Sequence, residues 1–295
     1  MREISVTSSP RPINVMTQIL PQPGEHFSWI PAPTPTATAT VGTTTVAAPA
    51  AVDVGAVLQC GPLAAIAPHF FTTRVLQLRR DSPEAADHWA AVASAIGVPP
   101  AQLRRMHQVH GCTTVAASSQ PPEHAPQADG VMTDERGIAL IVQVADCVPL
   151  LMADPRTGAV AAVHAGWRGT AANIAAAAVR RLQQQYGCRP EDLVAAIGPS
   201  IGACCYQVGP EVREAFTSTG ALDPGAWFTP DPHRSDRLRF DGWSANRDQL
   251  IAAGLNPANV HLARLCTMTH LSHFYSYRAE GAGTGRLLGV IRRAS

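Results

Sequence analysis

Short apolar runs that end abruptly at turn-forming residues constrain the fold of this chain more than any other feature. Two of them, Ile138–Val144 and Ala159–His164, are rich in Val and Ile and are bounded by Asp, Pro or Gly. Runs of this length without polar alternation are typical of buried strands. Leu193–Ile197 predicts a further strand, as do His69–Arg74 and Leu287–Ile291.

Helical segments lie between these strands. Ser82 is a candidate N-cap, with Pro83 at the first helical position, for a helix that runs through Ala95 and ends at Gly97. Further helices are predicted at Ala171–Gln185, Glu211–Phe216 and Ala245–Ala253. Because several strands are adjacent in sequence, the pattern favours a mixed α/β or α+β domain with mixed sheets over a regular doubly wound fold.

Residues 1–55 differ in composition from the rest of the chain. They hold eight prolines and nine threonines, many of them in the stretch Pro31–Ala51. Such a segment buries too little apolar surface to offset its ordering entropy. We therefore predict a disordered tail over 1–55 and one folded domain over 56–295.

The charge balance excludes several classes of function. The 23 basic and 22 acidic residues nearly cancel, which argues against a nucleic-acid arm or a membrane-surface patch. All 23 basic residues are arginine. A P-loop lysine, a Schiff-base lysine and a lysine general base are therefore excluded.

The cysteines and the apolar runs bear on the compartment. Seven widely spread cysteines are an odd number and do not form a disulfide framework. No apolar run reaches the ~18–20 residues that span a bilayer, and Met1–Gln18 has no secretory pattern. We expect a reducing compartment, the cytoplasm, and we favour a monomer.

The segment Val142–Thr170 carries the most chemistry. Cys147 follows a buried strand directly and has Asp146 before it, and His164 ends the next strand. A glycine-rich turn containing Arg168 then opens a helix. Free backbone amides and a guanidinium fork suit an anion such as phosphate or carboxylate.

A second histidine lies upstream in the segment Met106–Gly111. His110 would complete a set of two imidazoles and one thiolate with Cys147 and His164. Zinc accepts such ligands, and three protein ligands leave a fourth position open, as in catalytic zinc sites. Taken singly, however, Cys147 fits a buried apolar filler and His164 a hydrogen-bonded core histidine. The spacings between the three residues are no compact zinc signature.

Other candidates carry less information. Cys204 and Cys205 suit metal binding or a structural role, with the structural role favoured. His124 lies in a proline-rich loop and is expected to be solvated. The segment from Phe274 to Arg286 combines aromatic residues, arginines and glycines, which suits either a lid over a base and a phosphate or an ordinary hairpin.

Several motifs together resemble the YfiH-like laccase-domain family, whose members have been labelled multicopper polyphenol oxidases and purine nucleoside phosphorylases. The motifs occur in order from about His69 to Ile291. They are QVHG at Gln108–Gly111, ADG at Ala128–Gly130, ADCVPLLMADP at Ala145–Pro155, AAVHAGWRGT at Ala161–Thr170, IGPSIGACCYQVG at Ile197–Gly209 and ANRDQL at Ala245–Leu250.

The resemblance implies a fold, a site and an activity. The fold is a single sandwich-like α/β domain distantly related to bacterial cysteine deamidase toxins. His110, Cys147 and His164 match the family's ligand set, usually occupied by zinc, with copper less favoured. The activity is phosphorolysis of adenosine, inosine, guanosine and methylthioadenosine, with adenosine deamination alongside, so the partners are purine nucleosides and phosphate.

The chain departs from the family pattern in four places, one of which is around His88–Trp89, where an asparagine near the start of the helix is replaced. Val75–Leu78 replaces a Gly-Gly-Val-Ser type segment and is followed by a short loop, which puts any pocket contact from this loop in doubt. Ser200 stands where a cysteine is common. A second cysteine that usually follows Cys266 is missing. None of these changes touches the His–Cys–His set.

Phosphorolysis requires an anion site, and without lysine its side-chain cations must be arginines. Arg74, Arg168, Arg278 and Arg286 are the candidates, with Arg168 first and assigned a catalytic role beside Cys147, His110 and His164. Asp146 is expected to orient a histidine ligand. Zinc would polarise phosphate or activate water.

Three rival functions remain open. A cysteine hydrolase would use Cys147 as nucleophile and His164 or His110 as base. A copper-dependent polyphenol oxidase is less favoured, because three ligands without a second copper cluster provide no laccase electron-transfer path. A non-catalytic protein would bind nucleosides without turnover.

Overall fold

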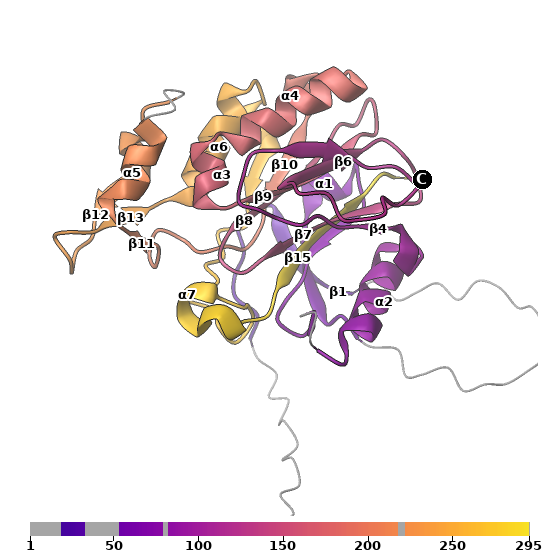
Figure 1. The fold of residues 1–295 in the computed structure, drawn as a ribbon, viewed down its shortest axis with the longest axis horizontal. Helices are drawn as coiled ribbons and strands as arrows, with labels where there is room; N and C mark the ends of the chain where they lie inside the picture. Colours follow the sequence, from indigo (N-terminus) through magenta and orange to yellow (C-terminus); the bar gives the residue numbers. More distant parts are fainter. Residues whose placement is uncertain (1–18, 33–52, 79–81, 218–221, 295) are drawn as a thin grey trace, which may run out of the picture.

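Two six-stranded β-sheets face each other in this protein, as a computed structural model shows for residues 19–32, 53–78, 82–217 and 222–294 (Figure 1). The first sheet has the strand order β1-β2-β3-β15-β7-β4 and the second β14-β10-β8-β9-β6-β5. Both are mixed, because the pairs β4–β7, β5–β6 and β10–β14 are parallel and the other pairs antiparallel. The sandwich-like domain with mixed sheets is thereby confirmed.

The first sheet is built from β1 (Phe27–Pro31), β2 (Ala56–Cys60), β3 (His69–Phe71), β4 (Leu103–Arg104), β7 (Ala139–Val144) and β15 (Leu287–Arg292). The second is built from β5 (Thr114–Ala116), β6 (Gly130–Thr133), β8 (Val148–Ala153), β9 (Val160–Ala165), β10 (Val194–Ile197) and β14 (Val260–Leu262). A third, three-stranded sheet contains β11 (Gln207–Val208), β12 (Phe228–Pro230) and β13 (Leu238–Phe240).

The helices are α1 (Gly61–Ala64), α2 (Ala85–Ile96), α3 (Trp167–Ala171), α4 (Ile174–Tyr186), α5 (Pro210–Thr217), α6 (Gly242–Ala252) and α7 (Tyr277–Glu280). Short 3-10 turns occupy Pro100–Gln102, Pro190–Asp192, Pro224–Trp227, Pro257–Asn259 and Gly281–Gly283. In the described part of the chain, no helix is long and apolar enough to span a bilayer.

The strand β8 shows why its apolar run has no polar alternation. Leu151 and Ala153 point into the core between the two sheets, together with residues of β7 and β15. Leu150 and Met152 point to the other face, where they meet the helices α4 and α6. Successive strand residues alternate between faces, so a strand covered on both sides is apolar at every position.

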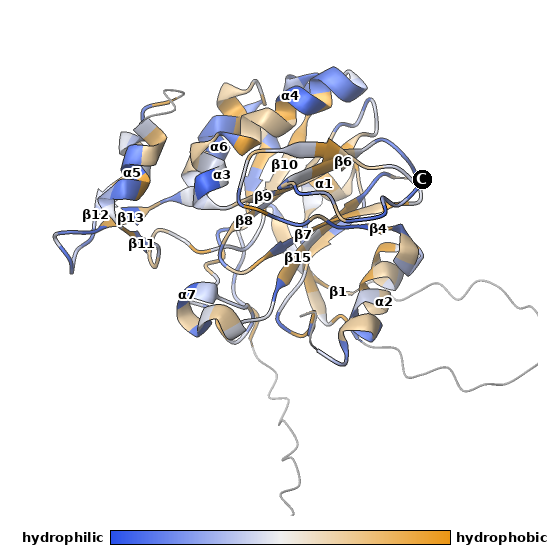
Figure 2. Ribbon diagram, viewed as in Figure 1, coloured by the Kyte–Doolittle hydropathy of each residue, from blue (hydrophilic) through white to orange (hydrophobic). Residues whose placement is uncertain are grey.

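Helices complete the layers on the outside of both sheets. α4 and α6 cover the second sheet, and α2 covers the first, as Figure 1 shows. The orange faces of these elements in Figure 2 lie inward, whereas α4 presents blue residues to solvent. The three-stranded sheet and α5 pack around their own aromatic cluster at one edge of the domain.

The structure confirms most strands predicted from the sequence and corrects two boundaries. The helix predicted from Ser82 begins at Ala85, with Glu84 as N-cap, and ends at Gly97 in the left-handed region (φ 77°) as expected. The helix predicted at 171–185 is divided between α3 and α4, because Asn173 adopts φ 60° and caps α4 with its own side chain. The strands β2, β4, β5, β6, β8, β11, β12, β13 and β14 were not predicted.

The prediction of a disordered tail over 1–55 is wrong for residues 19–32 and 53–55, and Val54 is buried in the core. Phe27–Pro31 forms β1, which pairs antiparallel with β2, and Phe27 joins the core between the sheets. Trp29 Nε1 also donates to the Pro21 carbonyl over 2.8 Å. This pairing with residues 56–60 outweighs the local composition. The remaining parts of the prediction, at 1–18 and 33–52, lie outside the described residues.

Candidate functional site

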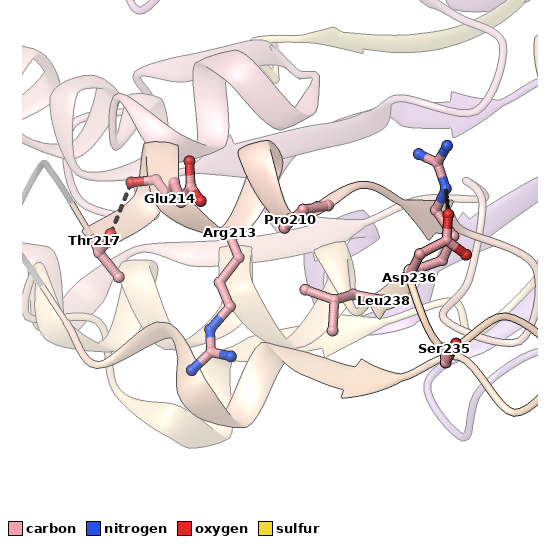
Figure 3. A pocket seen from close by; sticks show the side chains of 8 residues that line it. Pro210, Arg213, Glu214, Thr217, Ser235, Asp236 and Leu238 are labelled. Carbon is pink, nitrogen blue, oxygen red and sulfur yellow. Dashed lines mark hydrogen bonds and ion pairs between the residues drawn. The ribbon is translucent and has the colours of Figure 1, made fainter.

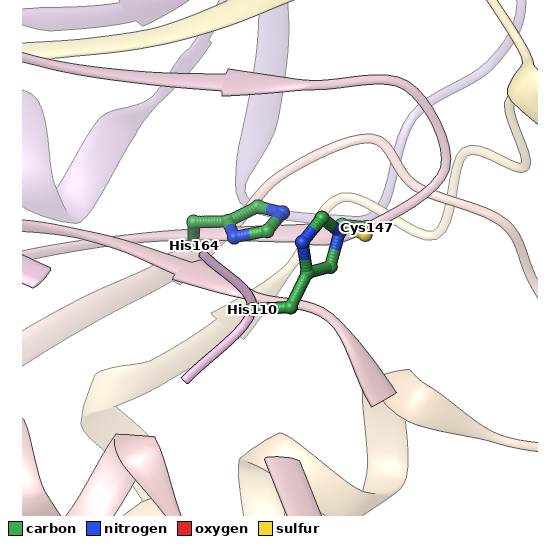
Figure 4. Close-up of side chains that lie close together, drawn as sticks. All are labelled: His110, Cys147 and His164. Atoms are coloured by element: carbon green, nitrogen blue, oxygen red, sulfur yellow. The ribbon is translucent and has the colours of Figure 1, made fainter. Parts of the chain in front are cut away.

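Three side chains from separate segments converge at one end of the second sheet (Figure 4). His110 lies in the loop before β5, Cys147 in the turn between β7 and β8, and His164 in β9. Their ligand atoms all lie within 4.8 Å of one another. The hairpin pairing of Pro149 with His164 places Cys147 beside the histidine, so the fold unites residues that are far apart in sequence.

Asp129 organises both histidines. Its buried carboxylate lies 2.7 Å from Nδ1 of His164, which leaves Nε2 of that ring directed to the Cys147 side. The same carboxylate accepts the backbone N–H groups of Val109, His110 and Gly111 over 3.2, 3.0 and 2.7 Å. One acidic residue therefore fixes the ring of one histidine and the loop that carries the other.

The expectation that Asp146 orients a histidine is wrong. Its carboxylate instead accepts the Thr267 hydroxyl and the Arg278 backbone N–H, each over 2.6 Å. These bonds hold Asp146 at φ 84°, in the left-handed region that an aspartate tolerates better than most residues. Asp129, which takes the orienting role, stands in the ADG motif, and its approach to His164 depends on the pairing of β6 with β9.

Gly166 lies directly beside His110 and Cys147. A Cβ atom there would lie 2.9 Å from Cδ2 of His110 and 3.2 Å from Sγ of Cys147. Its backbone has ordinary extended angles, so the requirement for glycine is steric and not conformational. The turn between β9 and α3 thus packs closely against two of the three side chains.

The charges of Cys147 and His164 depend on each other. Burial opposes ionisation of the Cys147 thiol, but hydrogen bonds from His110 and His164 and their charges outweigh it, and lower the pKa to about 6. Burial likewise opposes the imidazolium of His164, but Asp129 and Cys147 outweigh it and raise its pKa to about 9. At neutral pH the metal-free site therefore holds a thiolate beside an imidazolium.

This donor set fits a metal ion. A thiolate and imidazole nitrogens within 4.8 Å of one another suit a soft or borderline ion, and Asp129 supplies the outer hydrogen bond typical of a ligating histidine. Three ligands leave a position open. His110 is exposed and Cys147 half-buried, so that position faces a cavity.

The cavity has a volume of about 640 Å³, within the ~300–1,000 Å³ of small-molecule sites. It is lined by the three candidate ligands together with Gln108, Asp146, Trp167, Arg168, Ile201, Tyr206, Tyr277, Arg278 and Arg286, among others. In the described ranges no carboxylate side chain pairs with any of these three arginines. Arg168 stacks on Trp167 at 4.2 Å, and Arg278 on Tyr206 at 5.2 Å.

Other elements support the walls of this cavity. Gln108 exchanges two 2.8 Å hydrogen bonds with the backbone of Gln143 on β7, which pins the QVHG loop. Asn246 and Gln249 of the ANRDQL motif donate to the side chain and carbonyl of Thr170, which anchors α3 to α6. The hydroxyl of Ser200 accepts the indole N–H of Trp243 over 2.7 Å.

Arg74, the fourth arginine proposed for anion binding, has another role. Its guanidinium pairs with Glu280 over 2.8 Å and donates to the carbonyls of Leu271 and Phe274. It is not among the residues that line the cavity. Tyr277 lines the cavity, in agreement with the interpretation of Phe274–Arg286 as a segment beside a bound base, and Tyr206 lines it from the loop after β10.

The weaker candidates lie elsewhere. His124 is exposed, as expected. Cys204 and Cys205 come together with Cys266 in a separate cluster. A second pocket, between α5 and the loop before β13, is drawn in Figure 3; it is lined by Arg213, Glu214 and Asp236 among others and contains no thiol or imidazole.

Known proteins resemble this chain in sequence and in structure. The family model described as "Multi-copper polyphenol oxidoreductase laccase" matches residues 74–294. A protein of Bacteroides thetaiotaomicron named purine nucleoside phosphorylase is 41% identical over 176 residues, 60% of this chain and 64% of its own length. One of Deinococcus radiodurans with the same name is 35% identical over 76% of this chain and 88% of its own.

A further relative, from an unknown prokaryote, is named adenosine deaminase RL5 and is 33% identical over 72% of this chain and 84% of its own. Among solved structures, that of YlmD from Geobacillus stearothermophilus superposes with a TM-score of 0.74 at 29% identity. The superposition covers 81% of this chain and 96% of the other. The alignment with the Bacteroides protein spans slightly under two thirds of that relative.

Proposed function

The chain belongs to the multi-copper polyphenol oxidoreductase laccase family, and from this we propose that it is a zinc-dependent purine nucleoside phosphorylase that also deaminates adenosine. One observation carries the proposal. Arg168, Arg278 and Arg286 line the same cavity of about 640 Å³ into which His110 and Cys147 open. Relatives named purine nucleoside phosphorylase and adenosine deaminase support it.

The arginines supply the phosphate subsite. A phosphate dianion needs several charged donors, and the chain contains no lysine. Arg168 is exposed at the start of α3 and lies next to the metal-ligand cluster, so we assign it the attacking phosphate. Arg278 and Arg286 border the cavity from the C-terminal segment and complete the positive wall.

Aromatic side chains supply a surface for the purine. Tyr206 and Tyr277 line the cavity, and Tyr277 is 53% exposed, so its ring is accessible to a base. Stacking on an aromatic ring recognises any purine without selecting among adenine, hypoxanthine and guanine. This arrangement agrees with a site that accepts several nucleosides.

The reaction exchanges one bond at C1′ of the ribose. A phosphate oxygen forms a bond to C1′ while the bond from C1′ to the purine nitrogen breaks, and the departing purine takes up a proton. The arginines hold phosphate in line with C1′, which removes the entropic cost of a bimolecular encounter. His110, Cys147 and His164 would hold zinc, which would supply Lewis acidity for this reaction.

Deamination fits the same cavity. Water replaces the amino group at C6 of adenosine, and ammonia leaves. The chain's part is to hold His110, Cys147 and His164 in place through Asp129 and Gly166, and a metal ion held by these three residues would activate the water. Both reactions therefore depend on the same ligand set.

A direct test is chromatography of adenosine incubated with the zinc-loaded protein. With phosphate, adenine and ribose 1-phosphate are expected, and inosine appears with or without phosphate. Arg168→Gln should lower phosphorolysis about 10–100-fold, the effect of losing a charged hydrogen-bond donor, while deamination is less affected. Arg180→Gln, an exposed arginine of α4, is the matched control. Absence of all three products would refute the proposal.

A cysteine hydrolase is the second candidate, because Asp129, His164 and Cys147 form a hydrogen-bonded chain. Asp129 orients His164, and His164 stabilises the Cys147 thiolate, as a nucleophile and its base require. Elemental analysis separates the two functions. One tightly bound zinc ion per chain occupies the thiolate, whereas a metal-free and readily alkylated Cys147 favours hydrolysis. Stoichiometric copper with oxygen uptake on a phenol would instead indicate an oxidase.

A further inference from the structure

Three cysteines form a cluster that the proposed reaction does not use. The Sγ atoms of Cys204, Cys205 and Cys266 all lie within 4.8 Å of one another. Cys204 and Cys205 belong to the loop after β10, and Cys266 follows β14. None of the three lines the cavity described above.

The backbone holds these two segments together. Ser200 and Cys266 form a parallel bridge, with the Ser200 N–H donating to the Leu265 carbonyl over 3.2 Å and the Thr267 N–H to the Ser200 carbonyl over 3.1 Å. The N–H of Gly202 donates to Sγ of Cys266 over 3.3 Å. The bridge and this hydrogen bond hold Cys266 beside the start of the loop that carries Cys204 and Cys205.

Access to the cluster is graded. Cys266 is buried, Cys205 is half-buried and Cys204 is exposed. Because Cys204 is exposed, a small ion can reach the cluster from solvent. The guanidinium of Arg239 donates to the Cys204 carbonyl over 2.8 Å and also pairs with the buried carboxylate of Asp231, so it anchors this loop without adding a net charge to the cluster.

We propose that Cys204, Cys205 and Cys266 bind a second metal ion, and that the site is selective for copper(I). Thiolates select soft ions such as copper(I) and zinc. Three metal–sulfur bonds of about 2.3 Å in a trigonal plane place the sulfur atoms about 4.0 Å apart, a separation compatible with sulfur atoms that all lie within 4.8 Å of one another. The three thiol protons are released as the ion binds.

The number of ligands distinguishes copper(I) from zinc. Structural zinc is almost always four-coordinate, with four protein ligands. Among the described residues, no further His, Cys, Asp or Glu belongs to this group. Copper(I) is satisfied by three thiolates, so the donor set fits it better.

The test is an anaerobic titration of the full, reduced chain with copper(I), buffered by a chromophoric chelator. Thiol counting first confirms all seven cysteines free. Cys147→Ser removes the His–Cys–His site and should still bind one equivalent, with near-ultraviolet thiolate-to-copper absorption and three sulfur neighbours by X-ray absorption. Cys204→Ser should lose that equivalent, and Cys147→Ser combined with Cys204→Ser should bind none.

Two controls make the outcome decisive. Cys112→Ser removes an exposed thiol outside both clusters and should leave the stoichiometry unchanged. Cys204 is exposed, so its variant decides the matter even where Cys266→Ser fails to fold. The proposal is overturned if Cys147→Ser binds no copper(I), if Cys204→Ser retains the second equivalent, or if zinc displaces copper(I) from the cluster.

Discussion

Asp129 Oδ1 lies 2.7 Å from Nδ1 of His164, and both side chains are buried. The same carboxylate accepts three backbone N–H groups from the loop that carries His110. Removing its charge should therefore disturb two metal ligands at once. Outer partners of this kind contribute about 10–100-fold to metal affinity.

Asp129→Asn is accordingly expected to lower zinc affinity about 10–100-fold and to reduce both reactions of adenosine. Competition with a zinc-binding dye measures the affinity. Asp236→Asn, which changes an exposed carboxylate of the loop before β13, should leave the affinity unchanged. Wild-type affinity in Asp129→Asn would show that the histidines need no such support.

Gly166→Ala should damage the site although the backbone accommodates alanine. The new methyl group would lie within 2.9 Å of the His110 ring and 3.2 Å of the Cys147 sulfur, closer than such contacts normally come. We expect zinc affinity to fall at least about tenfold. Gly61→Ala, where the nearest atom is 3.7 Å away, is the control and should behave as wild type.

Local patterns predict the buried strands of this fold but not all the contacts between them. Runs such as Ile138–Val144 carry their own signature because both faces of the strand are covered. The strand β1 carries none, since FSWIP lies in a proline-rich stretch and is ordered by pairing with β2. β8 was missed because Pro149 stands near its start, where the sheet tolerates it.

In the candidate site, too, the sequence predicts some features and not others. His110, Cys147 and His164 are recognisable by residue type and motif, and the fold brings them together. The partner of His164 is not recognisable in this way: Asp146 is the neighbour of Cys147 in sequence, whereas Asp129 is the neighbour of His164 in space through the pairing of β6 with β9. Side-chain partnerships across strands depend on register, which the sequence alone leaves open.

Alkylation of Cys147 should report the charge coupling in the metal-free site. Because hydrogen bonds from His110 and His164 lower the pKa of Cys147 to about 6, its thiolate fraction rises through pH 6 and levels off above about pH 7. Mass spectrometry of the modified peptide after chelation and iodoacetamide treatment gives the rate. Added zinc should protect Cys147. In Asp129→Asn the imidazolium is less stable, so the midpoint should move to higher pH.

His69 gives the protein a defined weakness toward acid. The ring is buried between β2 and β15; its Nε2 accepts the Cys60 N–H and its Nδ1 donates to the Ala67 carbonyl, each over 3.0 Å. Burial lowers the pKa of His69 to about 4, against a partial opposing effect of the Ala67 carbonyl. The folded state therefore keeps the ring neutral where the unfolded chain, with an ordinary pKa near 6.5, binds a proton.

The sign of the pH effect follows directly. Above pH 6.5 both states are neutral and His69 contributes no pH dependence, whereas between pH 6.5 and 4 only the unfolded state gains the proton, so stability is lost. The loss between pH 7 and pH 5 should be about 2 kcal/mol. Urea unfolding of the chelated protein at pH 7 and pH 5 measures how much the free energy of unfolding falls between these two pH values. In His69→Gln this fall should be smaller than in the wild type by about 2 kcal/mol. His124→Gln changes an exposed histidine and is the control: its free energy of unfolding should fall between pH 7 and pH 5 as much as that of the wild type. If His69→Gln shows the same fall as the wild type, other groups cause the acid sensitivity.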